Sequence, residues 1–66
     1  MGISEYNKNL PSYKRMEIVT TLSEKTMSSK NVVYRWLTGN VVPPAIKRQI
    51  ISQVLDLSES ELWPEL

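Results

Sequence analysis

Four polar side chains that could contact a nucleic-acid base lie close together near the middle of the chain: Lys30, Asn31, Tyr34 and Arg35. Lysine and arginine donate hydrogen bonds to guanine, and asparagine can pair with adenine through two hydrogen bonds. Tyrosine can reach a phosphate or a thymine methyl group. Because none of the four is acidic, they predict one helix face suited to base edges in a DNA major groove.

A solvated helix face without a ligand is the alternative interpretation of the same residues. Polar side chains are expected opposite the apolar stripe of any surface helix. Arg35, near the end of its helix, also complements the helix dipole without any ligand. We favour the DNA-contacting interpretation because four side chains compatible with the groove cluster in six residues.

Apolar spacing predicts the two helices that would position this face. The first spans residues 12–25 and turns an apolar stripe inward, formed by Met16, Val19 and Leu22. The second spans about residues 29–38, with a serine hydroxyl of Ser28 or Ser29 as its cap. Its inward stripe is Val33, Trp36 and Leu37, and Gly39 gives a left-handed stop.

Two further helices are expected after a loop. Pro43 and Pro44 open an isoleucine-rich helix whose apolar spacing is set by Ile46, Ile50, Val54 and Leu57. Residues 58–61 (SESE) form a capping box for a short last helix, which Leu62 and Trp63 would pin to the core. We therefore expect an all-α fold with four helices in residues 12–66, preceded by a flexible N-terminal arm over residues 1–11.

The segment from Ser23 to Gly39 resembles the helix-turn-helix family of phage repressors and Cro-like regulators. The residues that carry this resemblance are Ser29, Val33, Trp36, Leu37 and Gly39, followed downstream by Pro43, Pro44, Glu61 and Leu62. The resemblance covers roughly residues 12–63. It implies a repressor-like domain whose second helix enters the major groove, with Lys30, Asn31, Tyr34 and Arg35 as base-reading residues.

The resemblance also implies contacts with the DNA backbone. The residues expected to approach phosphates are Ser28, Ser29, Thr38, Asn40, Lys47, Arg48, Lys14 and Arg15. Helix N-termini and hydroxyl groups commonly make such contacts. Lys47 and Arg48 lie in the first turns of their helix, where the local dipole is positive, so a bound phosphate would offset an unfavourable interaction. Ordinary surface solubility is the alternative for this pair.

Two features depart from the family pattern. Met27 occupies the tight turn where the family usually has glycine in a left-handed conformation, which costs methionine about 1 kcal/mol. In addition, only one clear helix precedes the turn where repressors usually show two. The missing helix is either shortened into residues 1–10 or lost.

Charge is distributed unevenly along the chain. Residues 1–50 hold all eight basic residues and three acidic ones, a net charge of +5, whereas residues 51–66 hold four acidic residues and no basic one. This separation favours one surface made for an anion over a uniform one. Ordinary surface charge that segregates by chance remains the alternative.

The residue types present argue against an enzyme. With no cysteine and no histidine, the chain lacks a thiolate, the usual general base and the commonest neutral metal ligand. We expect no catalytic residue, no metal and no cofactor. Trp36 and Trp63 are interpreted as core residues rather than stacking platforms for bases, and Met16 and Met27 as fillers of gaps in the core.

The expected function is sequence-specific binding of double-stranded DNA by a small transcriptional regulator, with a homodimer on DNA. No apolar run could span a membrane, and we expect no small-molecule ligand and a bacterial or phage protein of the cytoplasm. A protein-interaction module of the same fold, such as an antirepressor or adaptor, is the main rival. It would use an exposed apolar patch containing Val32, Val41, Val42 and Leu66. Non-specific nucleoid binding is a second rival.

Overall fold

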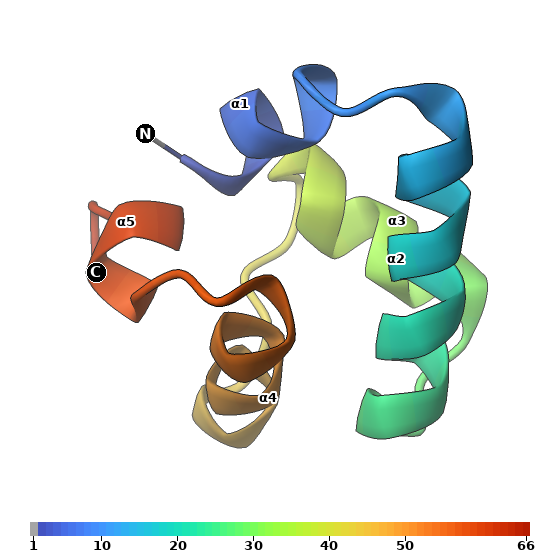
Figure 1. The fold of residues 1–66 in the computed structure, drawn as a ribbon. Coiled ribbons are helices and arrows are strands. Elements are labelled where there is room, and N and C mark those ends of the chain that lie inside the picture. The colour runs from blue at the N-terminus through green and yellow to red at the C-terminus, as the bar shows by residue number, and fades with distance from the viewer. Residues whose placement is uncertain (1) are drawn as a thin grey trace.

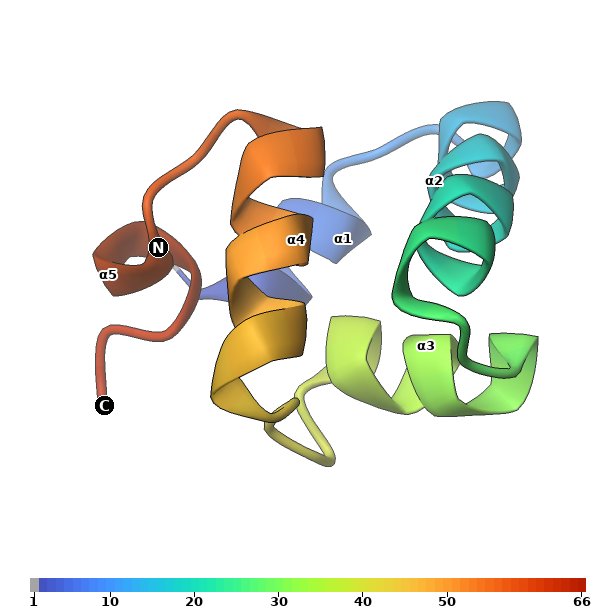
Figure 2. The same cartoon turned by 90° about the horizontal axis from the view of Figure 1, so that it is seen from below.

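The computed structural model describes residues 2–66, and all regular secondary structure in this part of the chain is α-helical. Its helices are α1 (Ile3–Lys8), α2 (Ser12–Thr26), α3 (Lys30–Thr38), α4 (Ala45–Leu55) and α5 (Glu59–Leu62). Helix α3 packs against α1 and α2, α4 packs against α2 and α5, and α1 contacts α5 (Figures 1 and 2). No helix among the described residues has the length and apolarity needed to cross a bilayer.

A single core lies between the helices. Its buried apolar residues are Ile3, Val19, Leu22, Val33, Trp36, Leu37, Ile51, Leu62 and Trp63. The predicted inward stripe of Val33, Trp36 and Leu37 is confirmed, as is the core position of Trp63. Because α3 contributes three of these side chains, its rotation about its own axis is set by the core.

The N-terminal segment differs from the expected flexible arm. Residues Ile3–Lys8 form α1, and Ile3 is buried with 3% of its surface exposed. The fold therefore has five helices in residues 2–66, and the domain extends to the N-terminal side of residue 12. Two helices precede the turn before α3, which agrees with the alternative of a helix shortened into residues 1–10.

Three apolar residues expected in the core lie instead at the surface. Met16 is 66% exposed, Met27 91% and Ile46 68%. Helix residues three or four positions apart can share a face, and the stripe of Val19 and Leu22 continues toward half-buried Arg15 rather than Met16. Met27 lies beyond the end of α2, where its left-handed backbone directs the side chain to solvent.

The turns at both ends of α3 use left-handed residues. Met27 has φ 55° and ψ 40°, as its position in the family pattern predicted, and Gly39 has φ 84°. Ser29 is the N-cap of α3, and its hydroxyl accepts a hydrogen bond from the backbone N–H of Val32 at 3.3 Å. Of the two serines expected as possible caps, Ser29 has this role.

Candidate nucleic-acid interface

The exposed face of α3 carries all four predicted base-reading residues. Each residue of a helix turns by about 100° relative to the one before it, and the buried stripe of Val33, Trp36 and Leu37 therefore directs Asn31 and Arg35 away from the core. Lys30 and Tyr34 flank them on one side, and Tyr34 is 45% exposed. The structure thus brings these four side chains onto one solvent-facing surface, as the sequence predicted.

The charge on this surface is not neutralised within the described part of the chain. Helix α3 contains no acidic residue. The ion pair found among residues 2–66 joins Arg48 to Glu59, so neither Lys30 nor Arg35 has a carboxylate partner there. The outer face of α3 therefore combines two cations, an amide and a phenol, all open to solvent.

Three predicted phosphate contacts lie at the two ends of α3. Ser29 is exposed at the N-terminal end, and its hydroxyl caps the helix. At the other end, the Thr38 hydroxyl donates to the carbonyl of Arg35 at 3.2 Å, and the Asn40 backbone N–H donates to the same carbonyl at 3.0 Å. The side chains of Thr38 and Asn40 are exposed at this end of the helix.

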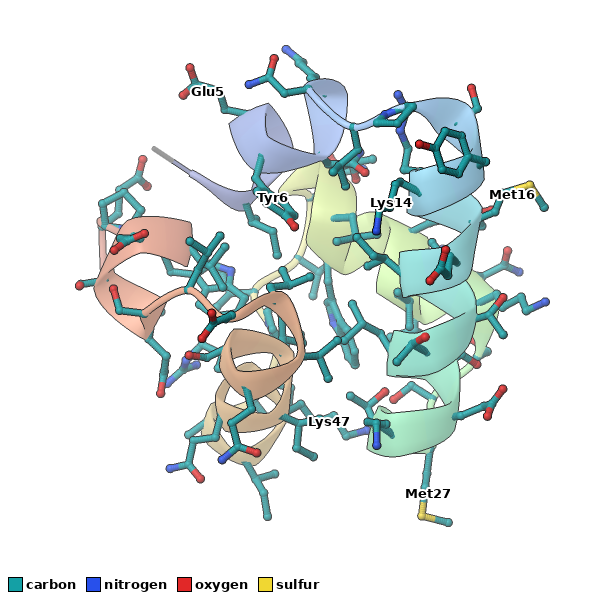
Figure 3. The ribbon with its side chains drawn as sticks, in the orientation of Figure 1. Glu5, Tyr6, Lys14, Met16, Met27 and Lys47 are labelled. Carbon is teal, nitrogen blue, oxygen red and sulfur yellow. The ribbon has the colours of Figure 1, made fainter. Side chains whose placement is uncertain are left out.

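Ser28 and Lys47 bind each other. The Lys47 ammonium donates a hydrogen bond of 2.8 Å to the Ser28 hydroxyl and lies 5.7 Å from the centroid of the Trp36 ring. The contact links the start of α4 to the turn between α2 and α3. Figure 3 shows Lys47 reaching from α4 toward the C-terminal end of α2.

Arg48 is also engaged within the fold. Its guanidinium donates to the carbonyl oxygen of Pro43 at 2.8 Å and to Glu59 Oε1 at 3.2 Å. Only 23% of its side chain is exposed. Arg48 therefore joins the loop before α4 to the first turn of α5.

Lys14 and Arg15 do not join the surface of α3. The Arg15 guanidinium donates to the carbonyl of Leu10 at 2.8 Å and connects α2 to the segment after α1. Lys14 lines a cleft with residues of α1 and α4. In Figure 1, α3 lies behind α2, whereas Figure 3 shows Lys14 pointing into the space in front, between α2 and α4.

Two residues with positioning contacts were missed by the sequence analysis. The Ser23 hydroxyl donates to the carbonyl of Ser28 at 2.7 Å, which braces the turn before α3. Glu59, in the first turn of α5, accepts a hydrogen bond from Arg48. The contact between Arg48 and Glu59 depends on how α4 and α5 pack, so local spacing carries no signal for it.

A groove of about 300 Å³ lies at the C-terminal end of α3, where Gly39 forms part of its lining. Its apolar lining includes Ile3, Val42, Leu62, Trp63 and Leu66. The Trp63 indole N–H is buried without a hydrogen-bond partner. Of the four residues in the predicted apolar patch, Val42 and Leu66 line this groove, whereas Val32 and Val41 are exposed but do not line it.

Comparison with known protein families, with curated proteins and with solved structures finds no match to this chain. The described residues hold no cluster of three or more side chains suited to a metal ion.

Proposed function

We propose that this protein is a small transcriptional regulator that binds double-stranded DNA sequence-specifically through the exposed face of α3. In this proposal α2 and α3 form the helix-turn-helix pair of a repressor-like domain. The observation that carries it is the surface of α3, where Lys30, Asn31 and Arg35 are exposed together with no acidic neighbour on the helix. An α-helix fits the major groove of B-DNA, and these side chains match the hydrogen-bonding groups found there.

Different parts of the helix have different roles in this proposal. Asn31 pairs with adenine and Arg35 donates to guanine, since both point most directly away from the core. Lys30 and Tyr34 contact the flanking bases. Ser29, Thr38 and Asn40, at the two ends of the helix, approach the phosphates and hold its register on the duplex; these contacts position the helix without reading sequence.

The proposal also includes two copies of the protein on one DNA site, an arrangement that its size permits. Helix-turn-helix dimers read half-sites whose centres lie about 34 Å apart, one helical turn of DNA. The Cα atoms of this molecule span 27 × 24 × 21 Å. Two copies whose α3 helices lie one turn apart therefore fit side by side, and we propose a homodimer on DNA.

Selection from a random duplex pool tests the proposal. The full chain is incubated with the pool at low and at moderate salt, and the bound duplexes are sequenced. The proposal predicts an enriched, roughly palindromic motif that persists at moderate salt. Binding without a motif, lost as salt rises, would identify non-specific phosphate contact instead.

Protein interaction through the groove beside the C-terminus is the second candidate. The specific observation that favours it is the apolar lining of this groove, with Val42 49% and Leu66 70% exposed. It predicts no duplex binding even at low salt. It also predicts that Leu66→Ser, which leaves α3 untouched, abolishes partner binding whereas Arg35→Ala does not.

A further inference from the structure

Ser28 lies in the turn between α2 and α3, and each of its polar groups has a hydrogen-bond partner in the protein. Its backbone N–H donates to the carbonyl of Ser23 at 3.1 Å, and its own carbonyl accepts from the Ser23 hydroxyl. The Ser28 hydroxyl donates to the carbonyl of Thr26 at 3.3 Å and accepts from Lys47. A serine hydroxyl has one hydrogen to donate, so it cannot donate to a phosphate while this arrangement holds.

Lys47 contacts both the turn before α3 and a core residue of α3. Its ammonium binds Ser28 in the turn, and it lies over the ring of Trp36, the largest buried side chain of α3. At 5.7 Å from the ring centroid, the cation is within the range of a cation–π interaction. Lys47 thus connects α4 to the turn that precedes α3 and to the buried face of α3.

Small movements at this turn would be amplified along α3. The helix rises about 1.5 Å per residue, so its far end lies roughly 12 Å from its start. A tilt of about 5° at the turn would therefore displace Thr38 by about 1 Å, more than the roughly 0.5 Å tolerated by a preorganised binding site. A contact that holds the turn can consequently control which bases the helix reaches.

We infer that Lys47 is a positioning residue, which sets the angle of α3 through Ser28 and Trp36, and is not a phosphate contact. The inference rests on the proposed function, since it assigns the source of base selectivity within the same site. It replaces the phosphate role that the sequence suggested for Lys47 and Ser28. Both residues then act through α3 rather than by touching DNA.

The variant Lys47→Met separates the two roles because methionine keeps much of the side-chain length but loses the ammonium. A lost phosphate contact would weaken all duplexes alike and reduce the slope of log affinity against log salt by about 0.9. A lost positioning contact lowers affinity for the selected site by about tenfold, the scale of one charged hydrogen bond. Affinity for unrelated duplexes and the salt slope then stay unchanged.

A double-mutant cycle with Ser28→Ala provides a second test. If the two residues act as one contact, Ser28→Ala reproduces the loss of selectivity, and the double variant is no worse than either single variant. Independent phosphate contacts would instead give additive losses. Lys14→Met is the matched control, because it removes a lysine from the other side of α2 and should leave the site preference intact.

Amide hydrogen exchange in the free protein gives a readout that does not depend on DNA. Lys47→Met should raise the exchange rate of the Ser28 amide by about tenfold, while the amides of α1 exchange as before. Unchanged exchange at Ser28, or a reduced salt slope with selectivity preserved, would overturn the inference. If the native protein bound no duplex at all, the proposed function would fail, and the exchange result alone would decide whether Lys47 holds the turn.

Discussion

The basic residues of α3 and those of α4 are alike in type but differ in their surroundings. Lys30 and Arg35 on α3 are exposed and have no carboxylate partner within residues 2–66. Lys47 and Arg48 on α4 are half-buried and donate to a hydroxyl, a backbone carbonyl and a carboxylate of the fold. The first pair is available to a ligand, whereas the second already holds neighbouring elements together.

The difference arises from the rotation of each helix against the core. Val33 and Leu37 face inward on α3, so the cations beside them must point to solvent. On α4, Ile51 is buried, and Lys47 lies one turn before it, near the α2–α3 turn. A basic residue near a proposed binding site is therefore not by itself a ligand contact. An exposed cation without a partner in the protein is the more informative feature.

The largest expected effect is the loss of DNA affinity in Arg35→Ala. Removal of a guanine contact should cost about 1–3 kcal/mol of binding and relax preference at one base position. The free energy of unfolding should change by less than about 0.5 kcal/mol, because the side chain is exposed. Titration of the selected duplex and thermal unfolding measure the two quantities. Unchanged affinity and preference would remove Arg35 from the interface.

For Arg48→Met we expect the reverse, a loss of folding stability and little loss of DNA affinity. Loss of its hydrogen bonds to Pro43 and Glu59 should lower the free energy of unfolding by about 1–2 kcal/mol. Glu59→Gln should cost less, since the Glu59 side chain is 42% exposed and its ion pair is screened by solvent. Urea unfolding of both variants provides the test. Unaltered stability together with a weaker salt dependence of DNA binding would place Arg48 with the cations of α3.

The smallest expected effect concerns the turns that flank α3. Met27→Gly should raise the free energy of unfolding by about 0.5–1 kcal/mol, because glycine adopts the left-handed conformation without steric cost. Gly39→Ala should lower it by about 1 kcal/mol at φ 84°. Circular dichroism during urea unfolding would measure both changes. A loss of stability in Met27→Gly, or a gain in Gly39→Ala, would mean that the turn concerned does not have the left-handed conformation described.

Local patterns were sufficient to predict most of the helix that carries the site. The serine cap, the stripe of Val33, Trp36 and Leu37, and the glycine stop all act within one short segment, and all three are confirmed. The predicted all-α class is also confirmed for residues 2–66. Helix α1 was only one of two alternatives for residues 1–10, because its six residues contribute only Ile3 to the buried core, too little for a recognisable period.

The surroundings of the site could not be predicted from local spacing. Lys47 and Ser28 are 19 residues apart, and Arg48 and Glu59 are 11 apart, so their contacts appear only when the helices pack. The exposed positions of Met16 and Ile46 have a similar origin. Each lies at a spacing compatible with the apolar stripe, and the choice of buried face is made by tertiary packing.

An NMR titration of the full chain with a selected duplex tests the central claim most directly. If the exposed face of α3 binds DNA, the largest amide shift changes should occur from Ser29 to Asn40, and the amides near Lys14 should change little. The Arg35→Ala protein should show weaker changes over the same residues. Changes concentrated at the groove of Ile3, Val42 and Leu66, or no changes at any duplex concentration, would contradict the assignment of α3 as the recognition helix.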